Sequence, residues 1–129
     1  MKRPLLAVTS ALVFVACGPP PAPKFSELQT KVFAPSCNFS TCHVAAGGGA
    51  GGLKLEATVS YQQLVNSPAT GTAGRTRVVP GDLKLSYLIE KLTSATPAAG
   101  VRMPQGGDPL EAERLDLIKA WIVAGAKND

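Results

Sequence analysis

Three long stretches of this sequence, residues 38–52, 67–80 and 96–107, carry neither a helical nor a strand pattern. They are rich in Gly, Pro, Thr or Ala, and each is predicted to form a loop. Loops of more than about a dozen residues are uncommon inside small domains unless they surround a site. The chain is therefore expected to fold as a small domain whose loops are organised around a common feature.

The first predicted helix directly follows a Pro-rich segment. Ser26 and Gln29 have the spacing of a capping box, which places the start of a helix at this point. Pro35 is expected to end the helix, because proline cannot continue the pattern of helical hydrogen bonds. The apolar face of this helix consists of Phe25, Leu28 and Val32.

Two further helices are predicted in the middle of the chain. A short one lies within residues 58–66, between two of the loops. Asp82 is the predicted N-cap of another helix over residues 83–93. Its apolar stripe consists of Leu85, Leu88, Ile89 and Leu92.

The last predicted helix has the clearest start signal in the sequence. Asp108 is its expected N-cap, Pro109 lies in the first turn, and the helix runs to Ala124, where Gly125 ends it. Its buried residues are expected to be Leu117, Ile118, Trp121 and Ile122. No run of alternating β-branched residues competes with these helices, so the predicted class is mostly α with long loops.

The first sixteen residues have the organisation of an export signal. Lys2 and Arg3 form a short basic segment, and an uncharged apolar run of about a dozen residues follows it. That run is too short to span a bilayer, which takes about 20 residues. Residues 1–16 are therefore predicted to be a signal peptide.

The four residues from Phe14 to Cys17 resemble a bacterial lipobox, in which the cysteine is acylated and becomes the mature N-terminus. Residues 17–24 would then be a lipid anchor and a Pro-rich tether in an extended polyproline conformation. A plain secretory signal is the alternative. Gly18 after the cysteine favours the outer membrane over the inner membrane, as expected from bacterial lipoprotein sorting. In either membrane the domain would face the periplasm.

The tether leads into one predicted domain, residues 25–129. The 113 residues from Cys17 onward carry 11 basic and 9 acidic side chains, a net charge of +2, with no Lys/Arg cluster. Nucleic acid is therefore excluded as an expected partner. Two cysteines remain besides Cys17, and in an oxidising compartment each is expected to be bonded to another group.

Those two cysteines, Cys37 and Cys42, have four residues between them, and the only histidine, His43, follows directly. Two cysteines followed at once by histidine form the attachment signature of c-type haem, in which two residues usually separate the cysteines. Each thiol forms a thioether with a haem vinyl group, and the histidine ligates the iron. On spacing alone, a disulfide between the cysteines is the simpler interpretation in an exported domain. A thioredoxin-like redox pair has two residues between its cysteines, not four. Structural zinc would need a fourth ligand besides the two cysteines and the histidine, and Asp or Glu would have to supply it.

Met103 is the only methionine after the signal peptide, and it lies in the loop over residues 96–107. Methionine usually fills gaps in a core, but this one lies outside any helical pattern. Its thioether is a candidate sixth ligand of haem iron, since no second histidine exists and the alternative would be a lysine. Only six aromatic residues follow the signal peptide, so a porphyrin would also supply apolar bulk that the core lacks.

Five short motifs occur in order between residues 25 and 126. They are FAPSC at 33–37 with CH at 42–43, GGLKL at 51–55, VVPGD at 78–82 with SYL at 86–88, RMP at 102–104, and AWI at 120–122 with GA at 125–126. The series resembles the small cytochrome c-like domain of planctomycete and myxobacterial proteins. The resemblance implies thioethers from haem c to Cys37 and Cys42, with His43 as the proximal and Met103 as the distal iron ligand. It also implies the cytochrome c fold, with short helices and long loops around one haem and the first and last helices crossing beside it.

These features predict a membrane-tethered, monomeric monohaem cytochrome that transfers single electrons between redox partner proteins outside the cytoplasm. A carrier is expected rather than an enzyme, because the sequence contains no evident nucleophile–base pair or paired carboxylates. One alternative is a haem-free surface lipoprotein that is held by a disulfide and acts as a binding module. Another is a haem sensor or peroxidase-like site in which Met103 does not ligate.

Two sets of side chains are candidates for contact with the haem. The apolar candidates, for which ordinary helix core is the competing interpretation, are Leu53, Leu55, Leu85, Leu88, Ile89, Leu117 and Trp121. The candidates for pairing with haem propionates are Arg75, Arg77 and Arg102, because guanidinium groups suit carboxylates.

Overall fold

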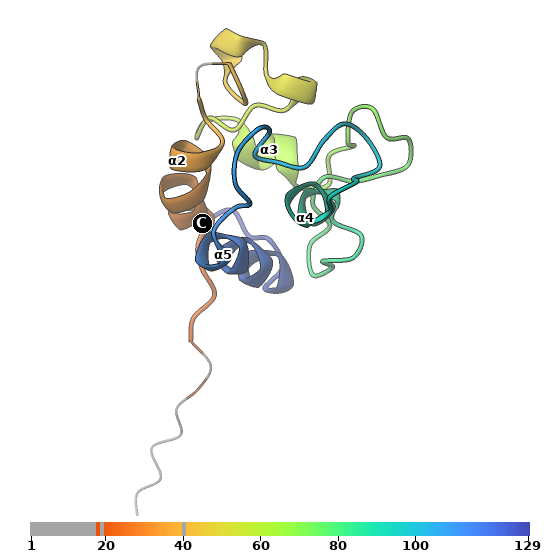
Figure 1. Ribbon diagram of the computed structural model, residues 1–129. Helices are drawn as coiled ribbons and strands as arrows, with labels where there is room; N and C mark the ends of the chain where they lie inside the picture. Colours follow the sequence, from red (N-terminus) through yellow and green to blue (C-terminus); the bar gives the residue numbers. More distant parts are fainter. Residues whose placement is uncertain (1–17, 19, 40) are drawn as a thin grey trace, which may run out of the picture.

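The computed structural model describes residue 18, residues 20–39 and residues 41–129. The predicted signal peptide, residues 1–16, and the predicted lipidation site Cys17 lie outside the described residues. Within the described chain the fold is mostly helical and has isolated β-bridges but no sheet, as predicted (Figure 1). None of the helices in this part is both long and apolar enough to cross a membrane.

Four helices are connected by the long loops. The first is continuous and consists of α1 (Phe25–Leu28), a π-helical segment (Gln29–Phe33) and α2 (Ala34–Ser36). The others are α3 (Ser60–Leu64), α4 (Tyr87–Thr93) and α5 (Ala112–Val123). The loop after the first helix contains two short 3-10 turns, Ala45–Gly47 and Ala50–Gly52. The helix predicted within residues 58–66 and the irregular stretches are thus confirmed.

The first helix differs from its prediction at both ends. Ser26 does not cap it, because the helix already begins at Phe25. Asp129 caps it instead: its side-chain Oδ1 accepts from Phe25 N–H at 2.9 Å, and its main-chain oxygen accepts from Ser26 N–H at 3.0 Å. Pro35 does not end the helix. The π-helical segment just before it interrupts the regular i→i−4 ladder, so the missing N–H of Pro35 is accommodated.

An aromatic cluster around Phe25 joins the first helix to α3 and α5. The ring centroid of Phe25 lies 5.2 Å from that of Tyr61, 5.3 Å from that of Trp121 and 6.0 Å from that of Phe33. Such pairs contribute roughly 0.5–1.5 kcal/mol each beyond the burial of their area. The first and last helices therefore pack against each other, and the described tether residues lead away from them (Figure 1).

Helix α4 starts later than predicted. The carboxylate of Asp82 accepts from the N–H groups of Lys84 and Leu85 at 2.8 and 2.9 Å, so it closes a turn instead of capping a helix. Ser86 has an extended backbone, and its hydroxyl donates to Asp82 O at 2.6 Å. The helix therefore begins at Tyr87, four residues after the predicted start.

Helix α5 also starts late, at Ala112 instead of directly after Asp108. Glu111 has a non-helical backbone, with a φ of −51° and a ψ of 140°, and the preceding Leu110 is buried in the core. Burial of that leucine accounts for a non-helical segment where the local sequence favours a helix. The end of α5 is as predicted, because Gly125 adopts a φ of +98° that favours glycine.

Replacing Asp129 by Ala is expected to lower the free energy of unfolding by about 1 kcal/mol, because the N–H of Phe25 loses its side-chain acceptor. Asp108→Ala is the matched control, since Asp108 is exposed and does not cap α5. Urea unfolding of both variants measures the difference. Equal midpoints for the two variants would exclude the capping role of Asp129.

Candidate functional site

One cavity of about 1060 Å³ brings together the residues that the sequence singled out. It lies between the first helix, the loop that carries Cys42 and His43, helix α4 and the loop before α5. Cys37, Cys42, His43 and Met103 all line it, although Met103 is 60 residues away from His43 along the chain. Its volume is just above the range of about 300–1,000 Å³ that is usual for small-molecule and cofactor sites.

The two cysteines lie at the end of the first helix. Cys37 N–H donates to Phe33 O at 2.9 Å, and His43 N–H donates to Cys37 O at 3.3 Å, which folds the loop back onto the helix end. The two thiols are not joined to each other. Burial, and then the neighbouring Cys42, raise the pKa of the Cys37 thiol to about 11, and Arg114 opposes this only in part. In the absence of a bonding partner, Cys37 therefore stays protonated near neutral pH.

The His43 ring is fixed by the backbone of the next segment. Its Nδ1 lies 3.0 Å from Leu53 O, and a carbonyl oxygen can only accept, so Nδ1 carries the proton. The main chain of His43 is also held, because its oxygen accepts from Leu55 N–H at 2.7 Å. This leaves Nε2 as the nitrogen with a free lone pair. A histidine that ligates a metal typically donates its other ring N–H in this way.

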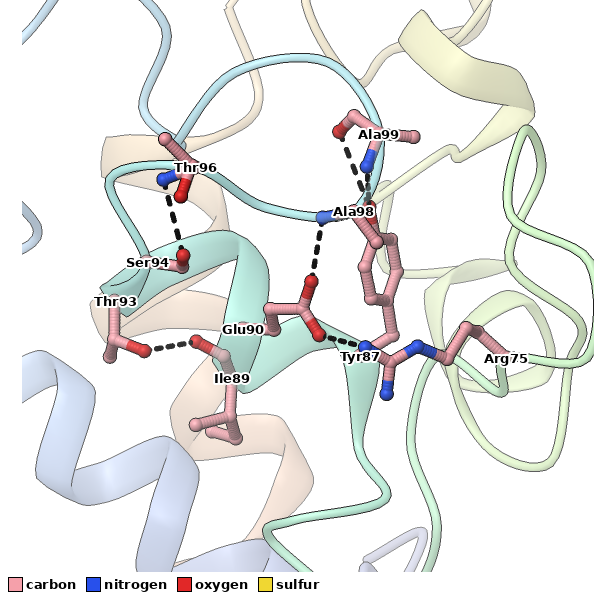
Figure 2. A network of polar contacts seen from close by, with 9 residues as sticks. All are labelled: Arg75, Tyr87, Ile89, Glu90, Thr93, Ser94, Thr96, Ala98 and Ala99. Atoms are coloured by element: carbon pink, nitrogen blue, oxygen red, sulfur yellow. Dashed lines mark hydrogen bonds and ion pairs between the residues drawn. The ribbon is translucent and has the colours of Figure 1, made fainter.

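The loop that carries Met103 is attached to one face of α4. Tyr87 Oη accepts from Ala99 N–H at 3.0 Å and donates to Ala99 O at 3.2 Å, while Glu90 accepts from Ala98 N–H at 2.7 Å (Figure 2). Arg75 forms an ion pair with Glu90, and its guanidinium carbon lies 5.7 Å from the centroid of the Tyr87 ring. Helix α4 and the loop before it thus fix the first half of the Met103 loop.

Lys91 completes this attachment next to Met103 itself. Its main-chain oxygen accepts from Met103 N–H at 2.8 Å. Its ammonium group donates to Ala99 O at 3.0 Å and to Val101 O at 2.5 Å. Met103 is therefore held by its own backbone and by the carbonyl groups just before it.

Replacing Lys91 by Met is expected to speed hydrogen exchange of the Met103 N–H about fivefold to tenfold. The variant loses two charge-assisted hydrogen bonds, and because the site is partly exposed to water the two together are worth about 1 kcal/mol in loop opening. Lys84→Met is the control, because Lys84 is exposed and its ammonium contacts no acceptor in the described chain. Exchange that is unchanged in the Lys91 variant would mean that the backbone contact alone holds the loop.

The cavity is largely apolar, and its charged lining is cationic. Arg77 and Lys91 are the charged residues in the lining, and no carboxylate of the described chain is among the lining residues. Arg77 donates to Gln63 O at 2.8 Å and to Thr70 Oγ1 at 3.0 Å. Burial lowers the pKa of Arg77, and its contacts include no acidic side chain. The cavity is thus suited to a large apolar group that carries negative charge at one edge.

The predicted apolar contacts are divided between the cavity and other places. Leu53, Leu55 and Leu88 line the cavity. Those that belong to the core or its margin without lining the cavity are Ile89, Leu117 and Trp121. Leu85 is 58% exposed, because α4 begins only after it, so its predicted role as a packing residue is wrong.

The three predicted arginines also have different positions. Arg77 lines the cavity, whereas Arg75 is engaged with Glu90 outside it. Arg102 lines a smaller surface hollow that adjoins the cavity and shares Val101 and Pro104 with it, and it makes only a long contact of 3.5 Å with Gly107 O. Of the three arginines, Arg77 is the one that lines the cavity itself.

Sequence reasoning missed several lining residues. The buried ones include Phe33, Leu64, Leu92 and Ile118, which the helical patterns marked as core or left unassigned. Phe39 and Val101 form an apolar lip, since they are 56% and 50% exposed and both line the cavity. The position of Phe39 between the two cysteines could have identified it, but no local signal marks Val101 or Lys91.

Structural zinc lacks a ligand set in this part of the chain. Among the described residues, no three or more His, Cys, Asp or Glu side chains are grouped so that they could hold a metal ion. Zinc in a structural site needs four such ligands. A haem iron needs fewer protein ligands, because the porphyrin occupies four positions and leaves two axial ones.

This chain matches no family model, and no curated protein or solved structure is significantly similar to it. The resemblance to cytochrome c-like domains therefore stays a prediction.

Proposed function

We propose that this protein is a monohaem c-type cytochrome that carries single electrons. The observation that supports this most strongly is the convergence of four residues on one apolar cavity: two thiols, the only histidine and the only methionine after the signal peptide. A disulfide-stapled module would account for the cysteines alone. It gives no reason for Met103, 60 residues after the motif, to line the same cavity as His43.

The residues that would hold the haem are Cys37 and Cys42 through thioethers, with His43 and Met103 as iron ligands. Each thioether would join a cysteine sulfur to a haem vinyl group by addition of the S–H group across the double bond, so no atom would be lost. When bound, haem supplies an iron that accepts and releases one electron, and ligation by histidine and methionine favours a higher reduction potential than ligation by two histidines.

The chain's own contribution would be to hold these groups still. The hydrogen bond from Nδ1 of His43 to Leu53 O fixes the imidazole, and the contacts of Lys91 fix the loop of Met103. Because His43 and the Met103 loop are both anchored, little of the protein would need to move during electron transfer. The apolar lining would exclude water, and Arg77 would face the propionates.

The remaining expectations belong to the same proposal. The helical domain would have the cytochrome c fold, which the packing of the first helix on α5 supports. It would be an exported monomer, anchored through Cys17 and held away from the outer membrane by the extended tether. Its partners would be redox proteins, which would approach the lip formed by Phe39 and Val101.

Expression of the precursor in a host with cytochrome c maturation tests the proposal. Haem absorbance is expected to migrate with the denatured polypeptide at one haem per chain, because thioethers survive denaturation. A chain that is exported and folded but carries no covalent haem would contradict it. A Cys37–Cys42 disulfide in that haem-free chain would then support the binding module.

A further inference from the structure

Gln29 lies outside the cavity lining, yet it links the first helix to the segment that holds His43. It is only 9% exposed, and it is the first residue of the π-helical segment. Its Nε2 donates to Leu55 O at 2.8 Å, and its Oε1 accepts from Ser60 Oγ at 2.9 Å. Burial of an amide is costly unless both of its ends are paired, and here both are.

Leu55 connects Gln29 to the histidine through its main chain. The carbonyl of Leu55 is bound by Gln29, and its N–H donates to His43 O at 2.7 Å. Two residues earlier, Leu53 O accepts from Nδ1 of His43 at 3.0 Å. The segment from Leu53 to Leu55 therefore holds both the main chain and the ring of His43, and the Gln29 amide fixes that segment to the first helix.

We propose, on the basis of the haem-binding function above, that Gln29 is a positioning residue that sets the orientation of the His43 imidazole and the hydrogen bond from its Nδ1–H. Donation of the Nδ1–H to a carbonyl makes a ligating imidazole a stronger electron donor and favours the oxidised iron. Gln29 maintains this bond by keeping the Leu53 carbonyl in place. Removal of its donor group is therefore expected to raise the reduction potential.

Gln29→Met and Ser60→Ala form a matched pair of variants. Gln29→Met keeps the size of the side chain but leaves Leu55 O without its donor. Ser60→Ala removes the hydroxyl at the other end of the amide and leaves the bond from Nε2 to Leu55 O in place. Gln29→Met loses both buried hydrogen bonds of the amide, and Ser60→Ala loses only the one between Ser60 and Gln29. Both variants are expected to be less stable, and a merely structural role would lower stability without a shift in potential that is confined to Gln29→Met.

The reduction potential and the amide exchange of Leu55 are measured in the haem-loaded chain. In Gln29→Met the equilibrium constant for reduction is expected to rise about threefold to tenfold, tenfold corresponding to 59 mV for one electron. The Leu55 N–H should exchange faster, and the paramagnetic shifts of the haem methyl groups should change with the ring orientation. In Ser60→Ala the equilibrium constant should change less than about twofold.

Each other outcome overturns the proposal in a distinguishable way. Equal potentials in wild type and Gln29→Met would make Gln29 merely structural, and equal shifts in both variants would assign the effect to general loosening. Wild-type chain without covalent haem would overturn the proposed function itself before any variant is compared. If Gln29→Met does not fold, Gln29→Asn replaces it, because its shorter amide cannot reach Leu55 O but remains polar.

Discussion

Replacing Cys37 and Cys42 together by Ser is expected to reduce covalently bound haem at least about tenfold. Serine keeps the size and polarity of the two side chains but forms no thioether, so haem would be lost when the protein is denatured. Both sulfurs line the cavity at the end of the first helix, and no other cysteine lies in residues 25–129. Haem absorbance of the denatured, purified chain measures the effect.

Cys17→Ser is the matched control for that experiment, because Cys17 is the third cysteine and lies in the predicted lipobox. It is expected to keep the haem and to lose the lipid, which partition into detergent would reveal. The single variants Cys37→Ser and Cys42→Ser should each keep one thioether. Haem that remains bound to the denatured double variant would exclude these two sulfurs as the attachment sites.

Replacing Met103 by Leu is expected to abolish the methionine-to-iron absorption band and to lower the reduction potential by roughly 0.1–0.3 V, within the range of about 0.8 V that axial ligands span. Leucine keeps the apolar volume of this half-buried residue and lacks sulfur, so the loop should retain its packing on α4. A thioether favours reduced iron, and its loss therefore favours the oxidised form. Visible spectra of the oxidised protein and a redox titration measure both effects.

Gln105→Ala is the control for the methionine variant, because Gln105 lines the cavity from the same loop but is not a proposed ligand. Its spectrum and potential should match those of the wild type. Carbon monoxide is expected to bind the reduced Met103→Leu protein and not the wild type. An unchanged oxidised spectrum in Met103→Leu would remove Met103 from the ligands, and carbon monoxide binding by the wild type would favour a sensor.

The helical periodicity predicted which segments form helices better than it predicted where those helices begin. Phe25, Leu28 and Val32 are buried along one face, and Ile118, Trp121 and Ile122 are buried along α5, as expected, whereas Leu117 is only half-buried. The predicted N-terminal caps all differ from the structure. Ser26, Asp82 and Asp108 have suitable side chains, yet Asp129 caps the first helix, Asp82 closes a turn and α5 begins after the buried Leu110. Whether a side chain caps a helix depends on contacts with residues that are distant in the sequence. A local sequence pattern does not include those residues.

The candidate site was predicted only in part. Cys37, Cys42 and His43 are adjacent in sequence, so their proximity required no knowledge of the fold. Elimination alone points to Met103, as the only methionine in residues 25–129, and the structure places it in the lining of the cavity. The local pattern marked Gln29 only as part of a capping box and did not mark Lys91 at all, because a glutamine or a lysine on a short helix is ordinarily a surface residue.

The sequence by itself determined the helical class, the long loops and the identity of the residues that could bind a haem. These properties depend on residue type and on spacing within one or two helical turns. Only the tertiary structure decided that Met103 and His43 line one cavity, that Arg77 and not Arg75 or Arg102 enters it, and that Gln29 reaches the backbone beside the histidine. These contacts join residues 26 or more positions apart, and they arise from packing that minimises exposed apolar surface over the whole chain.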